Sequence, residues 1–168
     1  MFWNTRDKIT DDRTFIISDH ATYSFSDIFQ MGDGLFANHA RGVCIIACQK
    51  TVETVAAYLG CLRAGIVPLL IDANLASSNI IDLAEKYQAE TILTLQTLDL
   101  ENYYYCGKFG VLKLYQIKKQ SKTNLNTELT LLLPTSGSTG DPKCVRLTAK
   151  KSRYMHKRNR QLFKSGRE

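Results

Sequence analysis

Residues 43–72 read VCIIACQKTVETVAAYLGCLRAGIVPLLID, a pattern that predicts a strand, a helix and a second strand. Two short apolar runs, Val43–Ala47 and Ile66–Ile71, flank Thr51–Ala64, a helical segment that is apolar over much of its surface. Short apolar runs separated by a helix are typical of parallel strands that are buried on both faces and joined by a right-handed crossover. The helix is expected to end at Gly65, because glycine readily adopts the left-handed conformation that closes a helix.

The same alternation continues on both sides of this unit. Downstream, Ser77–Ala89 has a helical pattern and Thr91–Leu95 supplies a third apolar run. Upstream, Thr14–Ser18 and Thr22–Ser24 are predicted to form a short hairpin. The sequence therefore predicts an α/β fold with a mostly parallel sheet and flanking helices.

A helix is expected between the hairpin and residue 43, with Ser26 as its cap. Gly32 and Gly34 weaken the middle of this helix, because glycine has a low helix propensity. Its apolar stripe consists of Ile28, Phe29, Leu35 and Phe36.

The C-terminal half is less regular. The three tyrosines Tyr103–Tyr105 indicate packing on an edge strand rather than a platform for stacked bases, because no basic groove surrounds them. Val111–Ile117 is expected to form a strand, and Lys118–Thr127 a polar linker. Two more strands are predicted at Leu129–Leu133 and Val145–Leu147.

The segment between these last strands reads PTSGSTGDPK, residues 134–143. Gly137 and Gly140 permit backbone conformations closed to other residues, and successive N–H groups in such turns form an anion-binding nest. Lys143 adds a mobile positive charge. Hydroxyl donors come from Thr135, Ser136, Ser138 and Thr139. The loop therefore suits a polyphosphate, although it is not the Walker loop, in which a Ser or Thr follows the lysine and a helix begins there.

Composition places the chain among ordinary globular proteins, since 44% of its 168 residues are apolar and 23% are charged. No apolar run approaches the roughly 20 residues that span a bilayer, and residues 1–12 lack the apolar run of a secretory signal. A cytoplasmic location is expected. Five cysteines without a Cys-x-x-Cys pair and three scattered histidines predict reduced core thiols and no metal site.

Positive charge is concentrated at the C-terminal end. Residues 1–149 contain 14 basic and 15 acidic side chains, whereas residues 150–168 contain eight and one. The expected division is therefore a domain at 1–148 and a basic tail at 149–168. Such a charge run is usually a solvated surface, and contact with nucleic-acid phosphates is the less favoured interpretation.

The string Leu132–Lys143 resembles the AMP-binding signature of the adenylate-forming superfamily, which includes acyl-CoA synthetases, adenylation domains of peptide synthetases and luciferases. Leu62–Asp72 and Tyr23–Asp27 are similar to elements that precede this loop in those enzymes. The likeness covers about residues 10–148 and implies an incomplete N-terminal subdomain of such an enzyme.

Enzymes of this family join a carboxylic acid to the α-phosphate of ATP, release pyrophosphate and pass the acyl group to a thiol. The resemblance implies ATP and Mg²⁺ as cofactors, contacts from Thr135–Gly140 to nucleotide phosphates, and a catalytic Lys143 that neutralises the leaving pyrophosphate. The family's other functional parts follow the loop, so the carboxylic acid and thiol acceptor concern a full-length form only.

Three hypotheses follow. In the first, the chain is a ligase fragment that is inactive alone, with its tail out of frame after a frameshift or premature stop. In the second, it is a small protein with a nucleic-acid-binding tail. In the third, it is an inactive remnant. Resemblance to the family favours the first.

Overall fold

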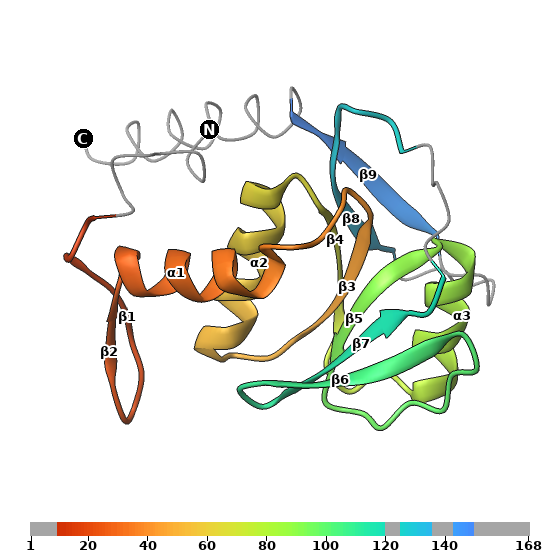
Figure 1. Cartoon of the computed structure of the whole chain (residues 1–168), viewed down its shortest axis with the longest axis horizontal. Helices are drawn as coiled ribbons and strands as arrows, with labels where there is room; N and C mark the ends of the chain where they lie inside the picture. The colour runs from red at the N-terminus through yellow and green to blue at the C-terminus, as the bar shows by residue number, and fades with distance from the viewer. Residues whose placement is uncertain (1–9, 120–124, 136–142, 150–168) are drawn as a thin grey trace, which may run out of the picture.

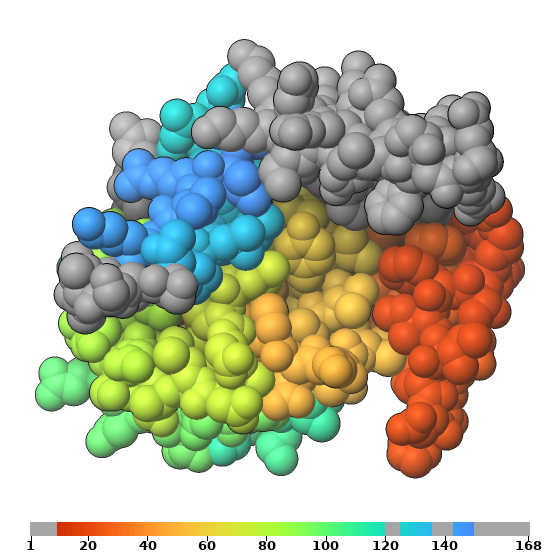
Figure 2. Space-filling view, turned by 180° about the vertical axis from the view of Figure 1, so that it is seen from behind, coloured from red at the N-terminus to blue at the C-terminus, as the bar shows by residue number. Residues whose placement is uncertain are grey.

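The structure is a computed structural model that describes residues 10–119, 125–135 and 143–149. Within these ranges a seven-stranded sheet has the order β6-β7-β5-β3-β4-β8-β9, and a separate hairpin, β1-β2, projects from the body (Figure 1 and Figure 2). The strands are β1 Thr14–Ile17, β2 Thr22–Ser24, β3 Val43–Cys48, β4 Val67–Asp72, β5 Ala89–Thr94, β6 Tyr103–Phe109, β7 Leu112–Ile117, β8 Leu129–Pro134 and β9 Cys144–Thr148. The helices are α1 Phe25–Phe36, α2 Val52–Ala64 and α3 Ser77–Lys86. None of these helices has the length and apolar character needed to cross a membrane.

The centre of the sheet is parallel, as the sequence predicts. Strands β5, β3, β4 and β8 are neighbours that run in one direction, with α2 and α3 as crossovers between β3, β4 and β5. Antiparallel strands complete the sheet at its two sides: β7 beside β5, β6 beside β7, and β9 beside β8. The α/β fold class is therefore confirmed, and so are the predicted hairpin and the tyrosine-bearing edge strand β6.

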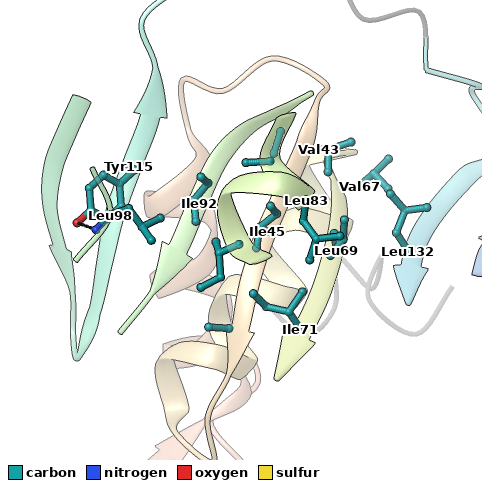
Figure 3. Close-up of a cluster of buried hydrophobic side chains, with 14 of the residues drawn as sticks. Val43, Ile45, Val67, Leu69, Ile71, Leu83, Ile92, Leu98, Tyr115 and Leu132 are labelled. Carbon is teal, nitrogen blue, oxygen red and sulfur yellow. Dashed lines mark hydrogen bonds between the residues drawn. The ribbon is translucent and has the colours of Figure 1, made fainter. Parts of the chain in front are cut away.

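Strand β3 is buried on both of its faces. Val43, Ile45 and Ala47 pack in the cluster that α3 covers, whereas Cys44 and Ile46 pack in the cluster under α2. All five side chains are at most 2% exposed. Figure 3 shows the cluster on the α3 side, where side chains of β4, β5 and α3 surround those of β3. A continuous apolar run in the sequence thus corresponds to a strand between two layers of helices.

Helix α2 begins and ends where the sequence predicts. The Oγ1 atom of Thr51, its N-cap, accepts a hydrogen bond of 3.4 Å from the N–H of Thr54. Gly65 closes the helix with a φ of 73°, in the left-handed region.

The predicted cap of α1 is wrong by two residues. Ser24, not Ser26, is the N-cap: its Oγ accepts from the Asp27 N–H at 3.1 Å, and Asp27 Oδ2 accepts from the Ser24 N–H at 2.8 Å. This is the reciprocal capping box, which requires an acceptor side chain three residues after the cap. Asp27 has that spacing from Ser24, so the helix begins at Phe25.

The predicted helix 77–89 is too long at its C-terminal end. Helix α3 ends at Lys86, and Ala89 already belongs to β5. Gln88 between them has a φ of 49°, a left-handed conformation that ends the helix and turns the chain into the strand.

Cysteines are not all in the core. The five are free, as expected, and Cys44 and Cys61 are buried, but Cys48 and Cys106 are exposed. The prediction of core thiols is wrong for these two, because Cys48 is the last residue of β3 and Cys106 lies on the edge strand β6.

Glycine at position 32 permits the close crossing of α1 and α2. A Cβ atom there would lie 2.4 Å from the Ala56 carbonyl oxygen and 2.9 Å from the Gly60 Cα. A Cβ on Gly60 would lie 2.5 Å from the Gly32 carbonyl oxygen. Gly32 therefore has a packing role that outweighs its low helix propensity, whereas Gly34 has no neighbouring atom within 4 Å of such a Cβ.

We expect Gly32→Ala to lower the free energy of unfolding by about 1–3 kcal/mol, because the added methyl group forces the two helices apart. Gly34→Ala is the matched control in the same helix and should raise it by about 0.5–1 kcal/mol through helix propensity. Chemical denaturation of both variants measures the two values. Equal changes in the free energy of unfolding, in the same direction for both variants, would contradict the close crossing of α1 and α2.

His39, which follows α1, has a partly buried imidazole ring. Its Nδ1 atom is buried and has no hydrogen-bond partner among the described residues, its Nε2 atom pairs with the Gln116 side chain, and its ring contacts Phe36 at a centroid distance of 5.3 Å. Burial lowers the pKa of His39 below its ordinary value of 6.5. The folded state therefore favours the neutral ring.

As the pH falls, the His39 ring takes up a proton at a higher pH in the unfolded chain than in the folded chain. The free energy of unfolding is therefore highest above pH 6.5, where the ring is neutral in both states, and decreases as the pH falls through and below that value. His39→Phe should flatten the dependence of unfolding free energy on pH between about 7.5 and 5.5. His20→Phe, at an exposed position of the hairpin turn, is the control. Parallel curves of unfolding free energy against pH for wild type and His39→Phe would refute the lowered pKa of His39.

Candidate functional site

The candidate site lies where β8 ends. Strand β8 is parallel to β4, and its residue Leu132 pairs with Leu69. The carboxyl end of β8 therefore lies at the same edge of the sheet as the carboxyl ends of β3, β4 and β5. In open α/β sheets, ligands bind at this edge. The loop that the sequence predicts to bind phosphate begins there, at Thr135.

Two predicted site residues, Thr135 and Lys143, close the base of this loop. The Thr135 N–H donates to the Lys143 carbonyl oxygen at 2.8 Å, and the Thr135 Oγ1 hydroxyl donates to the same oxygen at 3.0 Å. These bonds continue the antiparallel pairing of β8 and β9, whose last pair is Pro134 and Cys144. Both Thr135 and Lys143 are exposed, so the Lys143 ammonium is accessible to an anion.

The other predicted site residues lie outside the described residues. They are Ser136, Gly137, Ser138, Thr139 and Gly140. Their contacts with phosphate stay a prediction. The prediction that the loop joins two strands is confirmed, and this distinguishes it from the Walker loop, which leads into a helix.

A thiol and a carboxylate face each other on the neighbouring strands. Cys48 at the end of β3 is in register with Asp72 at the end of β4. Cys48 is accessible to solvent, but partial burial of its thiol raises the pKa of that group. A backbone hydrogen bond from Ile71 lowers this pKa, and the negative charge of Asp72 raises it. The Asp72 Oδ1 atom accepts from the Asn74 N–H at 2.7 Å. Cys48 therefore stays protonated at neutral pH and is not an activated nucleophile.

Two of the open hollows in the described part of the chain bear on the location of the site. One of about 400 Å³ is bounded by β1 and by Gln49–Thr51, which follow β3. The second, of about 320 Å³, is lined by Val43, Leu129 and Thr148 at the opposite edge of the sheet, with Arg146 and Tyr87 on its wall. The second hollow is therefore remote from the start of the candidate loop.

Fold and site together define an α/β protein with a candidate anion-binding loop at the carboxyl edge of its parallel strands. A model of the family described as AMP-binding enzyme matches residues 4–162. The chain belongs to the AMP-binding enzyme family. The matched range extends beyond residue 148, the boundary expected from composition, and that boundary stays a prediction. No curated protein sequence matches the chain.

Solved structures of adenylate-forming enzymes have a similar fold. The o-succinylbenzoate CoA synthetase MenE from Bacillus subtilis, in complex with the acyl-adenylate intermediate OSB-AMP, has a TM-score of 0.65 and 19% identity, over 91% of this chain and 43% of that one. The same enzyme with ATP and magnesium ion has a TM-score of 0.63 and 20% identity, over 91% and 44%. The N-terminal subdomain of Klebsiella oxytoca NpsA has a TM-score of 0.59 and 19% identity, over 84% and 40%.

These likenesses establish the fold as that of the N-terminal part of adenylate-forming enzymes. The chain spans about two fifths of the length of the chains it matches.

Thiol labelling tests the packing of α2 on the sheet. Cys48 and Cys106 should react with a small alkylating reagent in the folded protein, whereas Cys44 and Cys61 should be protected on the order of 1,000-fold or more, because they are exposed only by unfolding. Mass spectrometry of peptides after a timed pulse measures each rate. Labelling of Cys61 as fast as Cys48 would contradict the packing of α2 on β3.

Proposed function

We propose that the chain is the part of an acyl-adenylate-forming ligase that binds the nucleotide phosphates, through the loop from Thr135 to Lys143. One observation carries the proposal: in a chain of the AMP-binding family, two strands bring Thr135 and Lys143 together at the base of a glycine- and hydroxyl-rich loop, at the carboxyl edge of a parallel sheet.

Each part of the loop would have a separate task. Backbone N–H groups near Gly137 and Gly140 would donate to phosphate oxygens, and the side chains of Ser136, Ser138 and Thr139 would add hydroxyl donors. The Lys143 ammonium would attract the same oxygens as a point charge. Because the Lys143 carbonyl is held by Thr135, the lysine backbone is fixed while its side chain is free to reach the anion.

Mg²⁺ would enter with the nucleotide. This ion keeps several water ligands and is usually held by substrate phosphates and one or two carboxylates. It would offset the phosphate charge and so favour the departure of pyrophosphate when a carboxylate attacks the α-phosphate. In that reaction Lys143 would stabilise the charge that develops on the leaving pyrophosphate.

Complete catalysis would need more than this chain. MenE, which was solved with its acyl-adenylate intermediate, is more than twice as long, since the match covers 43% of it. We therefore propose that the chain binds nucleotide phosphates but does not complete adenylation by itself, and that a carboxylic acid and a thiol acceptor are partners of a longer form. A cytoplasmic location belongs to the same proposal.

Binding of pyrophosphate, measured by isothermal titration calorimetry with Mg²⁺ present, tests the proposal. Lys143→Ala should raise the dissociation constant about 10- to 100-fold, which is the worth of one charge-assisted hydrogen bond. Lys108→Ala is the control, because Lys108 is an exposed lysine on the edge strand β6, at the other end of the sheet order. Equal effects of the two substitutions, or no binding by the wild type, would refute a site in the loop.

A further inference from the structure

Arg41, two residues before β3, crosses the amino-terminal edge of the sheet. Its Nη1 atom donates to the Gly65 carbonyl oxygen, just before β4. Its Nη2 atom lies 3.0 Å from the Asn126 carbonyl oxygen, 3.4 Å from that of Thr127 and 2.9 Å from that of Leu129. One guanidinium therefore joins the beginnings of three neighbouring parallel strands, β3, β4 and β8.

The turn that Arg41 holds is the entry to β8. The Leu129 N–H donates to the Asn126 carbonyl oxygen at 3.0 Å, and the Glu128 N–H donates to Asn126 Oδ1 at 2.8 Å. The Ala149 N–H, after β9, donates to the Glu128 carbonyl oxygen at 3.2 Å. Arg41 therefore brings its Nη2 donors to a turn that has hydrogen bonds of its own, at the carbonyl oxygens of Asn126, Thr127 and Leu129.

Strand β8 is attached to the sheet by its pairing with β4 and by the buried side chains of Leu129 and Leu132, which lie in the same apolar cluster as Val43 and Leu69. Its pairing with β4 consists of the pair Leu69 and Leu132, whereas its pairing with β9 includes five residue pairs. The two strands β8 and β9 thus form a hairpin that is internally well paired and is joined to the sheet through one side of β8. Arg41 adds hydrogen bonds at the entry to β8 to this pairing and apolar packing.

We propose that Arg41 is a positioning residue for the candidate phosphate site, in that it sets the register of β8 and thereby the place of Thr135 and Lys143 at the opposite edge. The functional side of this inference rests on the proposed function. A slip of β8 by one residue would move the loop base by about 3.3 Å and turn its side chains to the other face. A loop displaced by that distance no longer presents its donors at the same point relative to β4.

Only arginine has the required donor geometry. Its planar guanidinium offers five N–H donors in a rigid fork, whereas the lysine ammonium is a point charge with three donors. Arg41 uses two nitrogens for its contacts, Nη1 for the Gly65 carbonyl oxygen and Nη2 for that of Leu129, whereas an ammonium has a single nitrogen. Charge alone should therefore not replace Arg41.

The test compares Arg41→Met and Arg41→Lys with Arg13→Met in the full chain. Arg13 is a matched control, because its hydrogen bonds are to Asp11, remote from β8 in the sequence. Backbone amide signals in nuclear magnetic resonance spectra report the positions of Thr135 and Lys143, and a pyrophosphate titration reports the site. Arg41→Met should shift both signals, leave that of Ile92 in β5 unchanged and raise the pyrophosphate dissociation constant roughly tenfold or more.

Arg41→Lys should behave like Arg41→Met, and it also serves as the test if Arg41→Met does not fold. Unchanged Thr135 and Lys143 signals in a folded Arg41 variant would overturn the inference, as would full rescue by lysine. If wild type binds no pyrophosphate but the signals still shift in the Arg41 variants, the positioning of β8 is supported and the proposed function is the part that fails.

Discussion

Burial of β3 on both faces determines how the other helices and strands are arranged. Residues Val43–Ala47 are almost inaccessible to solvent, so one helical layer must cover each face of the sheet. Helix α3 covers one face, and α2 covers the other with α1 packed behind it through the contact of Gly32 with Gly60. Because β4 and β5 flank β3 in parallel, their carboxyl ends share one edge, and β8 extends that edge to the candidate loop.

The carboxyl and amino-terminal ends of the parallel strands have different roles. At the carboxyl edge, Thr135 holds the backbone of Lys143 and leaves its ammonium exposed, which suits recognition of an anion. At the amino-terminal edge, Arg41 attaches the β8–β9 hairpin to the sheet. The link between them is β8 itself, an extended strand that transmits its register from one edge to the other. Membership of the AMP-binding family supports the proposal that this anion is a nucleotide phosphate.

Much of the fold could be predicted from the sequence, because buried parallel strands leave continuous apolar runs and Thr51 and Gly65 are strong helix signals. The failures are local. Ser24 rather than Ser26 caps α1, since the choice between two serines depends on the reach of Asp27, and α3 ends early because Gln88 adopts a left-handed conformation. Of the candidate site, the loop was evident from its composition. Arg41 was missed, because an arginine before a strand carries no sign of the carbonyl oxygens that the fold brings to it.

A crystal structure of the chain with Mg²⁺ and ATP would show whether this sheet presents a phosphate-binding loop at the carboxyl end of β8. We predict that the triphosphate lies in the loop between Thr135 and Lys143, with the lysine ammonium directed at the phosphate oxygens. A triphosphate bound instead to the basic residues 150–168, or at the opposite edge of the sheet beside Arg146, would contradict the claim.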